Sequence, residues 1–143
     1  MDDVLLNKVT IIERCLSRIA EEYDEHKQEL ETNLTRQDAI VLNLQRACEA
    51  SIDAAMHVVR SRSLGVPQQS REAFGMLHEA TLLDEPLCQR MQAMVGFRNV
   101  AVHDYRKLNM AILRAILDDR LEDFRQFSRQ LVIWAYEGSE QSN

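Results

Sequence analysis

Apolar residues recur through most of this 143-residue chain at alternating spacings of four and three positions, with polar residues between them. A period near 3.6 residues places such side chains on one face of an α-helix. The chain has only four glycines and two prolines that could interrupt the pattern. The pattern therefore predicts an all-α fold, in which long amphipathic helices pack through their apolar faces.

The periodic segments form four long helices and one short helix. We expect them at residues 3–30, 35–64, 70–82, 84–102 and 109–134. Thr35 and Asp38 have the spacing of a capping box at the start of the second helix, with Asp in place of the usual Glu or Gln, and Ser70 is a good N-cap for the short one. This predicts one up-and-down helical bundle over residues 1–137 and a flexible tail at 138–143. The apolar seam of the first helix is long enough that it could pack against another subunit.

Several classes of protein are disfavoured by composition. No apolar run approaches the roughly 18 residues of a membrane span, and Met1-Asp2-Asp3 does not begin a signal peptide, so a cytoplasmic protein is expected. The three cysteines, Cys15, Cys48 and Cys88, lie far apart without metal-ligand spacing. We expect them to be buried as small apolar residues, and we expect neither a metal site nor a cofactor.

The net charge of −6 argues against a protein that binds nucleic acid through overall positive charge. Residues 84–115, however, carry five basic and three acidic side chains. This segment is where we expect an anionic ligand to bind, although a difference of two charges also fits a local fluctuation.

The segment from Phe97 to Tyr105 concentrates most of the reactive side chains. Arg98 continues the apolar line of the fourth helix, at a position where a charge needs an anion or a watery cleft. His103 lies five residues later, about 140° further around an unbroken helix. If the two side chains cooperate within one chain, the helix must end or distort between them, and we expect its end near residue 102.

Neither a nucleophile elbow nor a glycine-rich phosphate loop occurs in the sequence. What remains for Arg98 and His103 is acid–base chemistry on a phosphodiester. In RNA the 2′-hydroxyl can act as the nucleophile, so an imidazole could move protons while a guanidinium stabilises the phosphate. The reaction involves two proton transfers and therefore needs two acid–base groups. A symmetric dimer with two copies of His103 would supply them. An isolated Arg and His pair is, however, more often structural.

A second polar stripe lies on the second helix, where Arg46, Asp53 and His57 share one face. These side chains could support a site in another helix. Such a group of residues is more often a hydrogen-bonded patch that only stabilises helix packing.

The spacing of Arg98, Asn99, His103 and Tyr105 resembles the Arg-x4-His-x-Tyr motif of HEPN domains of the HepT toxin type. The similarity continues outside the motif, in three further segments. They are residues 43–57, 67–77 and 94–99.

This resemblance implies an all-α homodimer whose two motifs face each other, and a metal-independent endoribonuclease that acts as the toxin of a toxin–antitoxin pair. Arg98 and His103 would be catalytic and Asn99 auxiliary. Asp53 and His57 match polar family positions, and their supporting role is a hypothesis. A minimal nucleotidyltransferase (MNT) antitoxin would transfer AMP to Tyr105, adding bulk and negative charge where an RNA phosphate must bind.

Two other interpretations remain open from the sequence. One is a non-catalytic HEPN-type dimer that binds a nucleotide or a partner protein through Arg98. The other is a purely structural helical dimer, in which Arg98→Met would be neutral or stabilising.

Overall fold

The computed structural model describes residues 1–141, with side chains described as far as residue 137. It confirms an all-α fold: the described residues form six α-helices, two 3-10 turns and no strand. The long helices are α1 (Asp3–Tyr23), α2 (Leu34–Ser61), α4 (Glu85–His103) and α6 (Leu121–Gln141), and the short ones are α3 (Ser70–Glu79) and α5 (Met110–Asp119). The turns are η1 (Lys27–Glu29) and η2 (Tyr105–Lys107).

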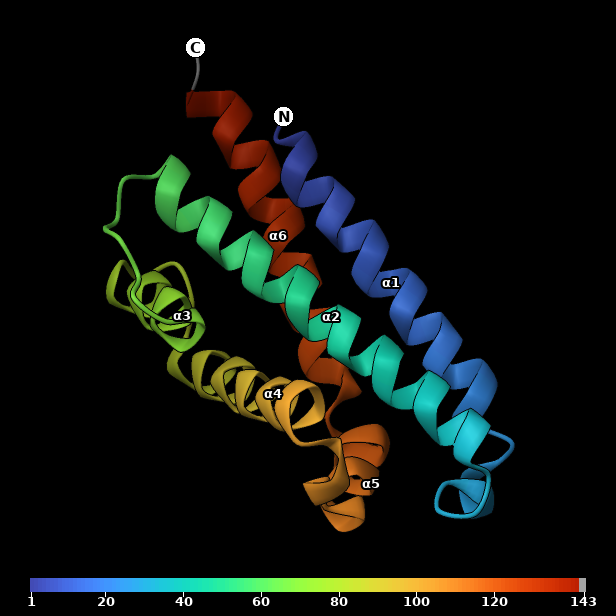
Figure 1. The fold of residues 1–143 in the computed structure, drawn as a ribbon. Coiled ribbons are helices and arrows are strands. Elements are labelled where there is room, and N and C mark those ends of the chain that lie inside the picture. The colour runs from blue at the N-terminus through green and yellow to red at the C-terminus, as the bar shows by residue number, and fades with distance from the viewer. Residues whose placement is uncertain (142–143) are drawn as a thin grey trace.

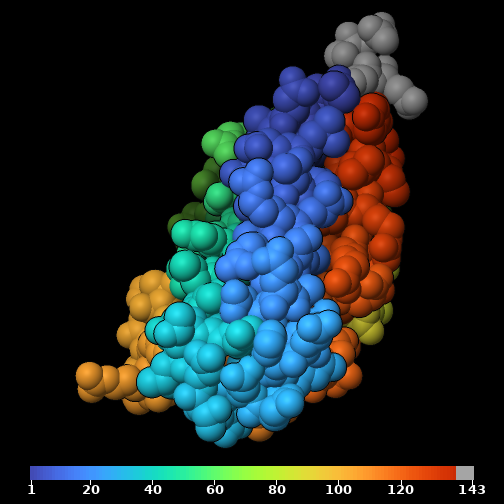
Figure 2. Space-filling view, turned by 90° about the vertical axis from the view of Figure 1, so that its right-hand side faces the viewer, coloured from blue at the N-terminus to red at the C-terminus, as the bar shows by residue number. Residues whose placement is uncertain are grey.

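Helices α1, α2 and α6 lie side by side along the molecule, with α3 and α4 crossing on one side of α2 and α5 at one end (Figure 1). Seen from the side, α1 runs between α2 and α6 (Figure 2). Helix α2 contacts α1, α3, α4 and α6, so it is the central element of the fold. None of the helices within residues 1–141 is long and apolar enough to cross a membrane.

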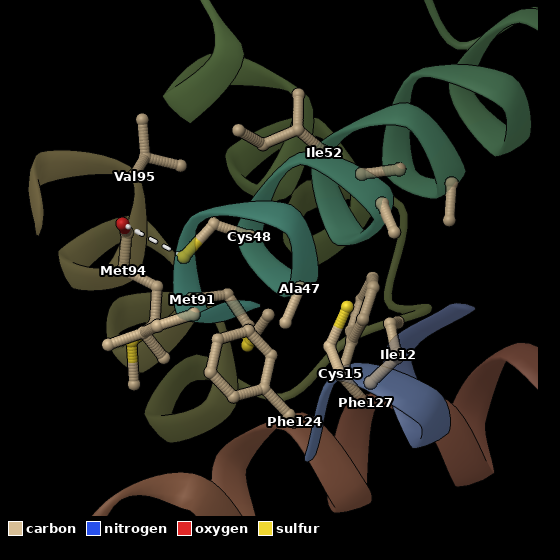
Figure 3. Close-up of a cluster of buried hydrophobic side chains, with 14 of the residues drawn as sticks. Ile12, Cys15, Ala47, Cys48, Ile52, Met91, Met94, Val95, Phe124 and Phe127 are labelled. Carbon is tan, nitrogen blue, oxygen red and sulfur yellow. Dashed lines mark hydrogen bonds between the residues drawn. The ribbon is translucent and has the colours of Figure 1, made fainter. Parts of the chain in front are cut away.

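The core follows from the apolar faces that meet around α2. Figure 3 shows Cys48 of α2 between side chains of α4, with its thiol donating a hydrogen bond to the carbonyl oxygen of Met94 at 3.5 Å. Phe127 of α6 packs edge-on against Phe74, with ring centroids 5.5 Å apart. All three cysteines are buried and free, as the sequence indicated. Burial raises the pKa of the Cys48 thiol, which therefore stays protonated.

Several helix boundaries differ from the sequence-based prediction, and the largest differences are in the first and last helices. Helix α1 ends at Tyr23 rather than near Leu30. Acidic residues are concentrated at this C-terminus and no basic residue occupies the last turn, which is unfavourable for the helix dipole. The expected helix over 109–134 is divided at Arg120 into α5 and α6. Asp118 and Asp119 are unfavourable at the end of α5, whereas Glu122 and Asp123 are favourable in the first turn of α6.

Both N-caps predicted at the starts of the second and third helices were wrong. The cap of α2 is Asn33, whose side chain accepts a hydrogen bond from the backbone N–H of Arg36 at 3.1 Å. Residue Ser70 is the first residue of α3 rather than its cap, which is Gln69. The prediction for the fourth helix was correct, because Asp84 caps it and it ends at His103, one residue beyond the expected end. Helix α6 reaches Gln141, and the tail expected at 138–143 falls partly outside the described residues, so its flexibility stays a prediction.

Candidate functional site

Arg98 lies on the side of α4 that faces the core, as its place in the apolar line predicted. Its Nη2 donates a hydrogen bond to the hydroxyl of Ser70, at the start of α3, at 3.3 Å. Its Nε is buried and has no hydrogen-bond partner among the described residues. The guanidinium is thus held at one end, and its buried Nε keeps an unused hydrogen-bond donor.

His103 is the last residue of α4 and its side chain is exposed. The helix continues without interruption from Arg98, because the N–H of Asp104 donates to the carbonyl of Val100 at 2.8 Å. Arg98 and His103 therefore point about 140° apart around the same helix. One chain does not place them on one face, and Asn99, which follows Arg98, is also exposed.

Tyr105 begins the turn η2 directly after α4, and its side chain is 37% exposed. Its hydroxyl donates a hydrogen bond to Asp38 Oδ1 of α2 at 2.7 Å, and Gln37 Oε1 lies at 3.4 Å. Burial and the hydrogen bond to the Asp38 carboxylate raise the pKa of Tyr105 well above its ordinary value, because both disfavour the phenolate. The phenol is therefore protonated and held in one orientation while it remains reachable from solvent.

Asp53 and His57 lie on the face of α2 that meets α1. Asp53 pairs with Lys8 at 3.5 Å, and His57 Nε2 contacts Asp2 Oδ2 at 2.7 Å. The hydrogen bonds and ion pairs of the described side chains do not connect either residue to Arg98 or His103. Within one chain they connect α1 and α2, so their auxiliary role stays a prediction. Arg46, the third member of this stripe, is exposed.

A groove of about 650 Å³ runs along the other side of α4, between that helix, α5 and the start of α6. Phe97 and Ile116 contribute to its apolar surface, and Arg90 lies on its edge, 3.7 Å from the buried carboxylate of Asp123. Burial raises the pKa of Asp123 even though Arg90 lowers it. Within the described part of the chain, no group of three or more His, Cys, Asp or Glu residues is arranged to hold a metal ion.

Three residues that contact the motif were not recognised as site residues in the sequence. Ser70 and Asp38 were assigned to helix caps, and Gln37 was not singled out. Their side chains instead contact Arg98 or Tyr105. The signal that could have found them is weak, because a polar residue near a helix start is normally used for capping.

Comparison with known proteins gives relatives over nearly the whole chain. The mRNA nuclease HepT of Shewanella oneidensis is 45% identical over 127 residues, which cover 89% of this chain and 95% of that protein. The fold is similar to that of the tri-AMPylated Shewanella oneidensis HEPN toxin solved in complex with its MNT antitoxin. The TM-score is 0.88 at 42% identity, covering 93% of this chain and 99% of that chain. A toxin–antitoxin structure with AMP-PNP has a TM-score of 0.87 at 42% identity, covering 92% of this chain and 99% of that one.

The resemblance drawn from the Arg-x4-His-x-Tyr motif is confirmed by these relatives. The family described as Ribonuclease HepT-like matches residues 12–131, which include every helix that contacts Arg98, His103 or Tyr105. This chain belongs to the HepT-like ribonuclease family.

Proposed function

We propose that this chain is the RNA-cleaving toxin of a HEPN/MNT toxin–antitoxin pair, with Arg98 and His103 as its catalytic residues. The observation that carries the proposal is the pair itself: a guanidinium with a free, buried donor and an exposed imidazole on the same helix of a HepT-like ribonuclease. The mRNA nuclease activity named for the Shewanella oneidensis relative supports the choice of RNA as substrate.

The functional unit of the proposal is a homodimer. Arg98 and His103 diverge by about 140° around α4, so a site that uses both is easier to build from two chains than from one. Val100 and Val102, which precede His103 in the last turn of α4, are 40% and 45% exposed, and Leu42 of α2 is 41% exposed. Apolar side chains around the proposed site fit a face that a second copy covers.

The chemistry that this dimer would perform is transfer of the RNA phosphodiester to its own 2′-oxygen. The 2′-oxygen bonds to phosphorus, the bond from phosphorus to the 5′-oxygen breaks, and the products are a cyclic phosphate and a free 5′-hydroxyl. One His103 accepts the proton of the 2′-hydroxyl, and the His103 of the other chain protonates the leaving oxygen. Arg98 stabilises the charge that develops on the phosphate oxygens.

Control of this activity would act through Tyr105, two residues after His103. The Shewanella oneidensis HEPN toxin was solved in a tri-AMPylated form with an MNT antitoxin, which supports transfer of AMP by an antitoxin of that class here. An AMP group on Tyr105 would place a phosphate and a nucleoside beside His103. Repulsion and occlusion would then both oppose RNA binding.

The catalytic assignment is tested by RNA cleavage with the purified dimer. The change His103→Ala should lower the cleavage rate by about 10²–10⁴-fold, the usual contribution of a positioned acid–base group. His26→Ala is the matched control, because His26 lies near η1 and pairs with Glu29 rather than with any residue of the motif. If His103→Ala cleaves RNA as fast as the parent, His103 is not catalytic.

The regulatory assignment is tested by intact mass after incubation with the cognate MNT antitoxin and ATP. The parent should gain one or more AMP groups, and Tyr105→Phe should gain none. An unchanged mass of the parent, or equal modification of Tyr105→Phe, would contradict the assignment of Tyr105 as the acceptor.

A further inference from the structure

The carboxylate of Asp38 contacts the phenolic oxygen of Tyr105, which is the atom that must react if AMP is transferred to this residue. Asp38 Oδ1 lies 2.7 Å from the phenolic oxygen and accepts its proton in a hydrogen bond. Asp38 is exposed near the start of α2, and Tyr105 is 37% exposed on η2, so both are open to an approaching enzyme. Figure 2 shows the start of α2, in cyan, beside the orange segment that follows residue 100.

The second acceptor near the phenol cannot take its proton. Gln37 Oε1 lies at 3.4 Å, and the amide nitrogen of this buried side chain donates to the carbonyl of Leu30 at 2.9 Å. An amide oxygen is a weak base, whereas a carboxylate at hydrogen-bonding distance is the usual general base for a hydroxyl nucleophile. Gln37 thus orients the phenol, and the Asp38 carboxylate is the group that can accept its proton.

We propose that Asp38 is the general base for AMPylation of Tyr105, so that the toxin itself supplies a catalytic group for its own modification. This inference rests on the proposed function, in which an antitoxin transfers AMP to Tyr105.

The step balances without a further reactant. The phenolic oxygen bonds to the α-phosphorus of ATP, and the bond from that phosphorus to the bridging oxygen of pyrophosphate breaks. Pyrophosphate leaves with the electron pair, and the phenolic proton passes to Asp38, which later releases it to water. A phenol is protonated at neutral pH, and burial and the Asp38 hydrogen bond raise the pKa of Tyr105 further, so without a base the phenolate would be scarce.

Charged side chains also lie on the same segment as the phenol. Arg106 and Lys107 follow Tyr105 in η2, and Asp104, which precedes it, pairs with Lys107 at 3.3 Å. His103 lies two residues before Tyr105. Variants must therefore be compared with the parent at each pH, so that the ratio of the two rates isolates Asp38.

The test is the rate of AMP addition under single-turnover conditions, measured by intact mass with the cognate MNT antitoxin and ATP. Asp38→Asn keeps a hydrogen-bond acceptor but removes the base, and it should lower the rate at pH 7 by about 10²-fold. From pH 7 to 9 the rate of this variant should rise about tenfold per pH unit relative to the parent, because the fraction of Tyr105 present as phenolate rises with pH. Asp38→Glu should recover part of the loss. Glu49→Gln, an equal change of charge further along α2, should leave the rate unchanged.

A second variant tests the base without relying on the geometry of Asn. Asp38→Ala should be slow, and sodium formate should restore part of its rate, while formate should not affect Glu49→Gln. Circular dichroism confirms that each variant keeps its helices.

The inference is overturned if Asp38→Asn is modified as fast as the parent with the same pH profile. It is also overturned if the loss does not depend on pH and neither Asp38→Glu nor formate restores the rate, because Asp38 would then only position the phenol. Failure of the proposed function has a different signature: the parent itself gains no AMP, or Tyr105→Phe is modified equally.

Discussion

At the scale of single residues, the polar side chains that look like helix caps divide into two groups. Asp2, Asn33, Asp84 and Asn109 do cap helices, each accepting hydrogen bonds from backbone N–H groups in the first turn. Asp38 and Ser70 instead bind Tyr105 and Arg98. Both kinds of residue favour the start of a helix, so the difference lies in which neighbour the fold brings near.

The N-cap Asp2 leads to a prediction about pH. Its carboxylate accepts the N–H groups of Val4 and Leu5 and contacts His57. Burial acts to raise the pKa of Asp2, but these hydrogen bonds outweigh it and the pKa is lowered. A lowered folded-state pKa means that the stabilisation is complete above the unfolded pKa, near 3.9, and is lost as the pH falls through the folded value.

We therefore expect Asp2→Ala to lower the free energy of unfolding by about 1 kcal/mol at pH 7. The difference from the parent should shrink towards zero as the pH is lowered below about 4. Urea unfolding at pH 7, 5 and 3.5 measures this difference. Glu13→Ala, an exposed mid-helix change, should stay within about 0.5 kcal/mol of the parent. A loss that is the same at every pH would contradict the role of the ionised carboxylate.

At the scale of elements, α4 decides the geometry of the candidate site. One side of it, with Met91 and Arg98, faces the core, whereas Gly96 and Phe97 on another side line the groove against α5. Gly96 lies on the groove side, where an added Cβ would meet no atom within 4 Å. The glycine is therefore not required by packing within the chain.

Replacing two glycines should have opposite effects on stability. Gly96→Ala should raise the free energy of unfolding by roughly 0.5–1 kcal/mol, because alanine loses less backbone entropy in a helix. Gly65→Ala should lower it by more than about 1 kcal/mol, because φ is +135° there, a backbone conformation that side-chain-bearing residues rarely adopt. Denaturant unfolding followed by circular dichroism measures both. A destabilising Gly96→Ala would indicate that another molecule packs on that side of α4.

At the scale of the whole molecule, α2 is the element on which the site is assembled. Tyr105 is anchored to it, Cys48 binds α4 to it, and α3, which carries Ser70, packs against it. Arg98 is thus held in place by its contact with Ser70, whereas His103 is exposed on a different face of α4. The proposed second copy is what would bring two imidazoles to one phosphate.

The homodimer leads to a prediction about mixed dimers. A chain of 16.6 kDa should sediment as a dimer of twice that mass, 33.2 kDa. A dimer of one parent chain and one His103→Ala chain, isolated with two different tags, should cleave RNA far below half the parent rate, because each cleavage uses both imidazoles. A mixed dimer with His26→Ala should cleave at nearly the full rate. Retention of half the activity by the His103→Ala mixture would show that each chain acts alone.

The sequence by itself determined the helical class, most helix starts, the burial of the cysteines, and the place of Arg98, His103 and Tyr105 at the end of one helix. These features depend on periodicity, capping and propensity, which act within a few residues. Only the tertiary structure decided the partners of the site. Arg98 and Ser70 are 28 positions apart, and Tyr105 and Asp38 are 67 apart. The crossing of α2, α3 and α4 brings these pairs together, and that crossing is a property of packed helices rather than of any single segment.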